Sequence, residues 1–313
     1  MCTGYEADRI IMEEKPQIFL KSITFNDNTS IKLEQNSIIV FTGANNSGKS
    51  QVLKDIEHEL DKSKQTSAII IKKTEFDYYG SIDESQFFSE HFKIDNNGYY
   101  HFSESNHGFT QDMLKRYWKN QTLYNELHKL FIKRLSTEIR LTSSNALNRL
   151  SDPEKHPIYK LVNNERIAQE VSDYFRQAFG VDLIINIKEM QTIPLHIGQS
   201  PDKKAFTIAM QDDYYNQVSA LPKLQDQGDG MRSFASILLD TFTSDYPITL
   251  IDEPEAFLHP PQARILGKML GNNSRDNRQL FISTHSEDFL QGLLDAENKN
   301  VTIIRINRED NVN

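Results

Sequence analysis

The segment from Gly43 to Ser50 combines residue types that bind phosphate groups. It fits the pattern G-x-x-x-x-G-K-[ST], in which glycines let the backbone wrap closely so that successive N–H groups point inward. Lys49 would reach the β- and γ-phosphates of a nucleoside triphosphate, and the Ser50 hydroxyl would ligate Mg²⁺. The alternative is an ordinary glycine turn, which the strand and helix patterns on either side disfavour. The predicted nucleotide-binding residues are Gly43, Ala44, Asn45, Asn46, Ser47, Gly48, Lys49, Ser50 and Gln51.

Two adjacent acids, Asp252 and Glu253, follow the apolar run at residues 248–251. Two carboxylates at the end of a buried strand are costly unless a cation compensates them. Mg²⁺ would do so for Asp252, and Glu253 would polarise the attacking water as general base. The sequence therefore predicts Ser50 and Asp252 as metal ligands, and Glu253 and Lys49 as catalytic residues.

A histidine, His285, follows the next apolar run, at residues 280–283. Parallel strands place their functional residues at their carboxyl ends. We therefore expect His285 at the same edge as Asp252, where it would contact the γ-phosphate as a third catalytic residue.

A second glycine-bearing segment lies at residues 227–233, at the start of a helix predicted over 231–242. Glycines at a helix start leave backbone N–H groups ready for an anion. Taken alone, a glycine-rich helix entry is the simpler interpretation, but the position shortly before Asp252 favours a nucleotide contact. The candidate residues are Gly228, Asp229, Gly230 and Arg232.

These motifs need a parallel sheet to bring them together. Short continuous apolar runs are typical of strands that are buried on both faces, and Val52, Leu53 and Ile56 follow the first glycine segment at helical spacing. Alternating patterns predict an antiparallel hairpin at residues 18–25 and 30–34. Further strands are predicted at 37–41, 68–71, 181–187, 205–210, 247–251, 280–283 and 301–305.

The middle of the chain has a helical pattern. Leu123, Leu127, Phe131, Leu135 and Ile139 recur at i, i+4 steps and predict one apolar helix face. A second helix is predicted at residues 164–179, with a glycine as its stop. The polar side of the first helix would carry a basic group that could touch nucleic acid phosphates or be a solvated face; its members are Lys129, Lys133, Arg134 and Arg140.

Composition excludes several classes of protein. The chain has 313 residues, 38% hydrophobic and 25% charged, so it is neither disordered nor collagenous. The net charge of −9 argues against a DNA binder that uses its whole surface. A single cysteine, Cys2, excludes an internal disulfide, and no apolar run reaches the roughly 20 residues of a membrane span. We expect a cytoplasmic protein with no membrane partner.

The motif order resembles that of ABC-type ATPases of the RecF/SMC/OLD-like branch, over about residues 18–305. Residues 43–50 look like the Walker A motif, 228–233 like the signature loop, and 284–285 like the switch histidine. Residues 252–260 are very similar to the DEPE-x-x-LHP Walker B and D-loop of the ATPases in OLD, Gabija, Septu and retron anti-phage systems. Gly228 stands where the signature serine is usual, and Gln86 is the candidate for the Q-loop glutamine.

The resemblance implies an α/β fold: a P-loop NTPase of the ABC type, whose head has a flanking antiparallel sheet and a helical lobe insertion. The expected divisions are a flexible tail at 1–17, core at 18–110, helical lobe at 111–180 and core again at 181–313. Two heads would sandwich two ATP molecules with Mg²⁺ in a homodimer or higher assembly. The signature residues would complete the other head's P-loop in trans, and Leu258 and His259 would lie at the dimer seam.

Three functions compete. The first is an ATP hydrolase that acts as sensor or scaffold for a separate effector, a nuclease or toxin, in anti-phage defence. The second is a RecF-like repair ATPase that binds DNA directly, or the ATPase part of an OLD-type nuclease without its Toprim domain. The third, a transporter subunit, is disfavoured by the long stretch between the P-loop helix and the signature.

Overall fold

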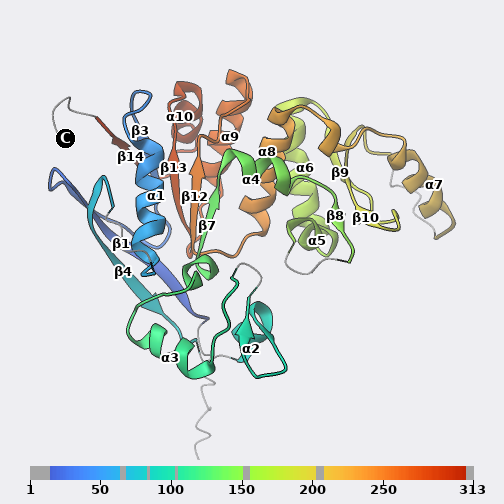
Figure 1. Ribbon diagram of the computed structural model, residues 1–313. Helices are drawn as coiled ribbons and strands as arrows, with labels where there is room; N and C mark the ends of the chain where they lie inside the picture. Colours follow the sequence, from blue (N-terminus) through green and yellow to red (C-terminus); the bar gives the residue numbers. More distant parts are fainter. Residues whose placement is uncertain are drawn as a thin grey trace, which may run out of the picture. The chain divides into compact units, whose positions relative to one another are not determined.

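The chain divides into two compact units in the computed structural model, which describes residues 15–63, 68–82, 85–102, 105–150, 156–201 and 208–307. The first unit comprises Met1–Leu33 and Asp55–Ile132, and the second Glu34–Lys54 and Lys133–Asn313. Most of the expected tail, residues 1–14, lies outside the described residues, and the first strand already begins at Gln17. Figure 1 labels the elements of each unit.

The first unit contains a three-stranded antiparallel sheet in the order β2-β1-β4, which confirms the predicted hairpin and flanking sheet. The strand predicted at 68–71 is wrong in its position, because β4 begins at Ile71. The Asp55 carboxylate accepts hydrogen bonds from the backbone N–H groups of Ile69, Ile70 and Ile71. The N–H groups before β4 are therefore not available for pairing with a neighbouring strand. The strands are β1 (Gln17–Phe25), β2 (Ser30–Lys32) and β4 (Ile71–Tyr79).

Aromatic side chains fill the rest of the first unit. Phe87 contacts the rings of Phe92 and Phe131, and Phe102 stacks on Phe109. Buried rings of this size supply much of the apolar area that holds a small unit together. The remaining elements are α2 (Ser85–His91), β5 (Lys93–Ile94), β6 (Tyr100–His101), α3 (Gln111–Lys119) and the 3₁₀ helix η1 (Leu127–Leu130).

The second unit is built on a five-stranded sheet in the order β14-β3-β13-β12-β7. The pairs β14–β3, β3–β13 and β13–β12 are parallel, which confirms the predicted parallel core of an α/β fold. The register pairs Asp252 with Ser283 and Ser283 with Phe41, so the carboxyl ends of the three central strands meet at one edge. The strands are β3 (Ile38–Thr42), β7 (Ile132–Leu135), β12 (Ile248–Asp252), β13 (Gln279–Ser283) and β14 (Val301–Arg305).

One face of this sheet forms the main hydrophobic core with four helices and the short helix α5 (Pro157–Val162). Val40, Ile251 and Ile282 on the sheet pack with buried side chains such as Phe234 and Leu266 on the helices. The four helices are α6 (Glu165–Phe179), α8 (Asp229–Thr243), α9 (Pro260–Asn272) and α10 (Glu287–Leu294). The predicted limits of α6 are confirmed, since Asn164 caps its start and Gly180 ends it at φ +73°.

The remaining elements of the second unit are short. Figure 1 shows α4 beside α8, and α7 at the far end of the β9 region. The strand predicted at 205–210 is wrong where it is described, because residues 208–210 open helix α7, while 205–207 lie outside the described residues. The elements are α4 (Thr137–Ser143), α5 (Pro157–Val162), α7 (Ile208–Ser219), η3 (Leu224–Asp226), and the paired strands β8 (Leu147–Asn148) with β10 (Thr192–Ile193) and β9 (Asp182–Ile185) with β11 (Leu195–Gly198).

The long helix predicted through Leu123 to Ile139 is wrong. The chain forms η1 there and then β7, an edge strand of the central sheet. Leu127 and Phe131 are buried in the first unit, Leu135 belongs to the core of the second, and Ile139 is exposed, so the i, i+4 spacing did not mark one face. The range 111–180, expected as a helical lobe, therefore also contributes a core strand and is divided between the units.

In the part of the chain that the structure describes, every helix is too short or too polar to cross a membrane.

Candidate nucleotide-binding site

The loop between β3 and α1 (Lys49–Leu60) has a backbone that only glycine adopts easily at two points. Gly43 has φ +151° and Gly48 φ +105°. A Cβ atom on Gly43 would lie 2.3 Å from the carbonyl oxygen of Ile306, so no larger residue fits. Ala44, Asn45 and Asn46 lie exposed at the tip, Ser50 lies in the first turn of α1, and Gln51 follows it. The loop thus presents backbone groups and the amino end of a helix, which together favour an anion.

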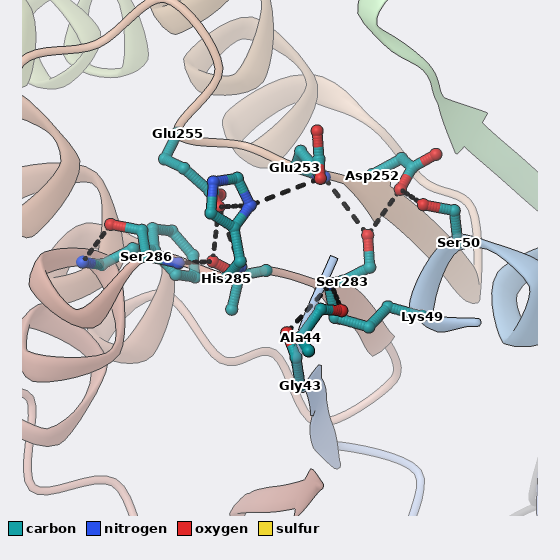
Figure 2. A network of polar contacts seen from close by, with 12 residues as sticks. Gly43, Ala44, Lys49, Ser50, Asp252, Glu253, Glu255, Ser283, His285 and Ser286 are labelled. Carbon is teal, nitrogen blue, oxygen red and sulfur yellow. Dashed lines mark hydrogen bonds and ion pairs between the residues drawn. The ribbon is translucent and has the colours of Figure 1, made fainter. Parts of the chain in front are cut away.

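Lys49 is folded back onto this loop. Its ammonium group donates to the carbonyl oxygens of Gly43 at 3.0 Å and Ala44 at 2.8 Å, and the residue is 5% exposed (Figure 2). The buried Ser47 hydroxyl has no hydrogen-bond partner among the described residues. A confined cation beside an unpaired hydroxyl fits a phosphate group, whose oxygens accept from both.

Asp252 is the junction of three elements. Its Oδ1 accepts from the Ser50 hydroxyl of α1 at 2.7 Å and from the Ser283 hydroxyl of β13 (Figure 2). Its Oδ2 lies 3.6 Å from Nη2 of Arg134 on β7. The structure thus brings together Ser50 and Asp252, as predicted, more than two hundred positions apart in the chain.

These two residues fit a magnesium site that is shared with a nucleotide. Magnesium is commonly held by one or two carboxylates and by phosphate oxygens and water, so a cage of three acids is not required. Among the described residues no group of three or more His, Cys, Asp or Glu side chains could hold a metal. The Ser50 hydroxyl and the Asp252 carboxylate would be the protein ligands, and the ion would supply charge compensation for the phosphates.

Glu253 has an unusual backbone conformation, with φ +47°. Its N–H group donates to the Ser283 carbonyl at 3.0 Å, and its side chain is 41% exposed. This conformation is strained for a non-glycine residue, and it persists only where the surrounding structure holds the backbone in place. At this exposure the carboxylate is accessible to water.

His285 follows the carboxyl end of β13, which pairs with the end of β12 at Asp252, so it lies at the expected sheet edge, and its ring is beside Glu253. Its Nδ1 is 3.3 Å from Oε1 of Glu253 and 3.4 Å from Oε1 of Glu255 (Figure 2). Glu255 is 8% exposed and accepts from the Thr284 hydroxyl at 2.7 Å and the His285 backbone N–H at 3.1 Å. Glu255 therefore fixes the turn that presents His285.

The signature residues lie at the amino end of α8. Gly228 is the helix N-cap, and Arg232 pairs with Asp229 at 3.3 Å and donates to the carbonyl of Leu141 on α4. A Cβ on Gly230 would lie 2.6 Å from the carbonyl oxygen of Phe257, so this glycine lets α8 approach the D-loop. In the described part of the chain, Arg232 donates to Asp229 and to α4, and none of its hydrogen bonds reaches the P-loop.

The D-loop has an exposed aromatic residue at its turn. Phe257 has φ +68° and is 54% exposed. Leu258 is partly buried against the core, and His259 caps α9, with its N–H donating to Gln262 at 2.9 Å.

The basic helix face, expected either to touch nucleic acid phosphates or to be solvated, does not form. Arg140 is fully buried, Lys133 pairs with Asp240 at 2.6 Å, and Arg134 faces Asp252. Lys129, which lies on η1 in the first unit, pairs with Glu126, the residue directly before η1. Three of these cations pair with acids within the chain, and the fourth, Arg140, is buried, so they do not form one exposed basic surface.

Four residues of the site were not predicted from the sequence: Arg134, Arg140, Glu255 and Ser283. Ser283 and Glu255 could have been found, because both belong to motifs already singled out at strand ends. Arg134 lies on β7 and Arg140 on the following helix α4, in a segment where the apolar periodicity predicted one long helix. The side chain of Gln86, the Q-loop candidate, lies outside the described residues.

Comparisons with known proteins agree with this geometry. The sequence matches the family described as "AAA domain, putative AbiEii toxin, Type IV TA system" over residues 38–290. No curated protein matches the chain by sequence. A solved Smc head bound to the C-winged helix domain of ScpA is 15% identical, with TM-score 0.50, covering 93% of this chain and 95% of that chain.

Two further Smc heads are similar. The Pyrococcus furiosus head domain with an extended coiled coil, bound to the C-terminal domain of ScpA, has TM-score 0.44 and 10% identity over 88% of this chain and 92% of that chain. The Thermotoga maritima head domain has TM-score 0.40 and 12% identity over 87% and 91%. The likeness to the first Smc head, at 15% identity and TM-score 0.50, concerns the fold, which is that of a P-loop ATPase head. Because the family match spans most of its length, the chain belongs to this AAA domain family.

Proposed function

We propose that the chain is a Mg²⁺-dependent ATP hydrolase of the ABC type that closes head to head around ATP and regulates a separate effector. The observation that carries the hydrolase proposal is the junction at Asp252. There the P-loop serine, the strand-end acid and the next acid, Glu253, meet at one sheet edge beside Lys49.

The proposed roles follow from the positions of the side chains. Lys49 and the loop N–H groups hold the β- and γ-phosphates, while Ser50 and Asp252 hold the ion. Glu253 accepts a proton from the attacking water, and His285, in contact with that carboxylate, orients it and reaches toward the γ-phosphate. Removing water from the closed site would strengthen each of these interactions.

Head-to-head closure is supported by the contacts of the signature residues. Within their own chain, Arg232 donates to α4 and Gly230 lies against the D-loop. Their remaining surface at a helix start is suited to an anion from outside the chain. A second copy, related by a two-fold axis, would bring its nucleotide there, and each copy would do the same for the other.

The effector role in anti-phage defence is supported by sequence features. The D-loop motif at residues 252–260 is of the OLD-like kind, and the family description refers to a toxin in a type IV TA system. We propose a nuclease or toxin as the separate partner. Direct DNA binding, as in RecF-like repair, loses its main support because the basic group expected on one helix face is paired or buried.

Solution mass of the Glu253→Gln variant, with and without ATP and Mg²⁺, tests the proposal. The variant should bind ATP but not hydrolyse it, so the closed dimer should accumulate only with nucleotide. Asp213→Asn, an exposed acid on α7, is the matched control and should hydrolyse ATP like the wild type. Hydrolysis by Glu253→Gln at the wild-type rate would refute the general base, and a monomer under both conditions would refute closure.

A further inference from the structure

Arg140 is a buried cation whose partners are all uncharged. The residue is fully buried on α4, and in the described part of the chain no carboxylate lies within ion-pair distance of it. Buried charges are usually paired with an opposite charge, because desolvation is expensive. Burial lowers the pKa of Arg140, and the more distant carboxylates of Asp252, Glu255 and Glu253 raise it. Packing alone does not account for a charged guanidinium in this position.

The hydrogen-bond acceptors of Arg140 account for its position. Nη1 donates to the backbone carbonyl of Asp252 at 2.6 Å, and Nη2 donates to the carbonyl of Glu253 at 3.0 Å. Nε donates to the Ser233 hydroxyl on α8 at 2.9 Å. The two remaining bonds go to the Leu135 carbonyl and the Thr137 hydroxyl, so all five N–H donors are used.

The contact with Glu253 bears on its strained backbone. Glu253 has φ +47°, its N–H is held by Ser283, and its carbonyl is held by Arg140. The N–H and the carbonyl group of Glu253 are therefore both held by hydrogen bonds. Loss of the Arg140 bond would allow the backbone to relax to an ordinary conformation, which would redirect the carboxylate.

The contact with Ser233 bears on the signature helix. Ser233 is fully buried one position after Arg232, and Arg232 itself donates to Leu141 on α4. Helix α4 is thus tied to the start of α8 by two adjacent side chains and to the end of β12 by Arg140. A movement of the signature loop would therefore be transmitted to the backbone of Glu253 through the guanidinium group of Arg140.

We propose that Arg140 is a positioning residue that holds the general base Glu253 and couples it to the signature helix of the same chain. This inference rests on the proposed function. In a head-to-head dimer, the signature loop of one chain would contact the nucleotide of the other. Arg140 would then make the placement of Glu253 in one site depend on the nucleotide in the other site.

The test compares two buried serines on one helix. Ser233→Ala removes the acceptor of Arg140, and Ser236→Ala is the matched control, because Ser236 is 1% exposed and its hydroxyl has no partner among the described residues. In the full chain, Ser233→Ala should lower kcat roughly 10- to 100-fold with KM for ATP within about twofold, as expected for a misplaced catalytic group. Ser236→Ala should leave both constants within about twofold of the wild type.

A second pair of variants separates positioning from general stability. Arg140→Lys should lower kcat, whereas Arg278→Lys alters another buried arginine, which donates to the carbonyls of Thr241 and Asn273, and should lower the thermal midpoint without changing kcat of the folded protein. Equal kcat values for Ser233→Ala and Ser236→Ala in a wild type that hydrolyses ATP would overturn this inference alone. A wild type that does not hydrolyse ATP would overturn the proposed function and this inference together.

Discussion

Lys49 shows how a single side chain is prepared for its ligand. Its ammonium group is confined by two loop carbonyls, with the residue 5% exposed, and the carbonyl oxygen of Ile306 leaves no room for a bulkier residue at Gly43. The cation is therefore positioned before a ligand arrives, which lowers the entropy lost on binding. The hydrogen bonds of Lys49 follow from the local sequence, because both of its acceptors lie in the loop directly before it.

Lys49→Ala should weaken binding of ATP and ADP by roughly tenfold or more, because it removes the charge that lies nearest the β- and γ-phosphates. Calorimetric titration of nucleotide into the purified chain measures this loss. Lys54→Ala is the matched control, since Lys54 is an exposed lysine of the same helix. Equal affinities for the two variants would mean that Lys49 does not face the phosphates.

At the scale of elements, the contact between α8 and the D-loop depends on Gly230. A Cβ atom there would lie 2.6 Å from the carbonyl oxygen of Phe257, and backbone must move to relieve this clash. Gly230→Ala should therefore lower the free energy of unfolding by about 1–3 kcal/mol, the usual range for overpacking. Urea denaturation measures this change.

Gly228→Ala supplies the comparison for Gly230→Ala. A Cβ on Gly228 meets nothing within 4 Å, so only the loss of a favourable N-cap residue is expected, below about 1 kcal/mol. If Gly230→Ala were as stable as Gly228→Ala, the close approach of α8 to the D-loop would not be real.

Helix α5 has a cap that should respond to pH. The His156 Nδ1 accepts from the Ile158 N–H at 3.2 Å, and burial, with Lys133 nearby, lowers the pKa of His156. The unfolded pKa is about 6.5, so above it the histidine is neutral in both states and the cap is intact. As the pH falls below about 6.5, the unfolded chain takes up the proton first, and stability decreases.

His156→Asn retains a cap that does not titrate. The variant should lose less stability than the wild type between pH 7.5 and pH 5.5, by an amount within the 0.5–2 kcal/mol or so that a cap contributes. Urea unfolding of both proteins at the two pH values gives the difference. An identical pH dependence would show that the His156 ring does not act as a neutral acceptor.

The comparison of elements also shows what the sequence could predict. Strands β3, β12 and β13 are largely apolar runs with polar residues at their carboxyl ends. Both these strands and the contact between Ser50 and Asp252 could therefore be predicted from the sequence. Strand β7 has only four residues, and its Lys133 and Arg134 looked like a polar helix face. Their partners Asp240 and Asp252 lie more than a hundred positions away, and such pairing leaves no local signal.

At the scale of the whole molecule, the proposed head-to-head closure predicts that the signature residues of one chain act on the nucleotide held by a second chain. Mixed dimers test this arrangement. Lys49→Ala damages the P-loop, and Gly228→Asp places a carboxylate where the partner's phosphates would lie while keeping a good N-cap residue in open space. Each variant alone should have little ATPase activity.

An equal mixture of Lys49→Ala and Gly228→Asp should recover roughly a quarter of the wild-type activity, because half of the randomly paired dimers are mixed and each mixed dimer has one intact site of two. The control is a mixture of Lys49→Ala with Glu253→Gln. Both of those defects belong to the nucleotide's own chain, so each site of that mixed dimer retains one of them and no activity should return. Recovery in the control, or none in the Gly228→Asp mixture after exchange of chains, would show that the signature does not act on the partner's nucleotide.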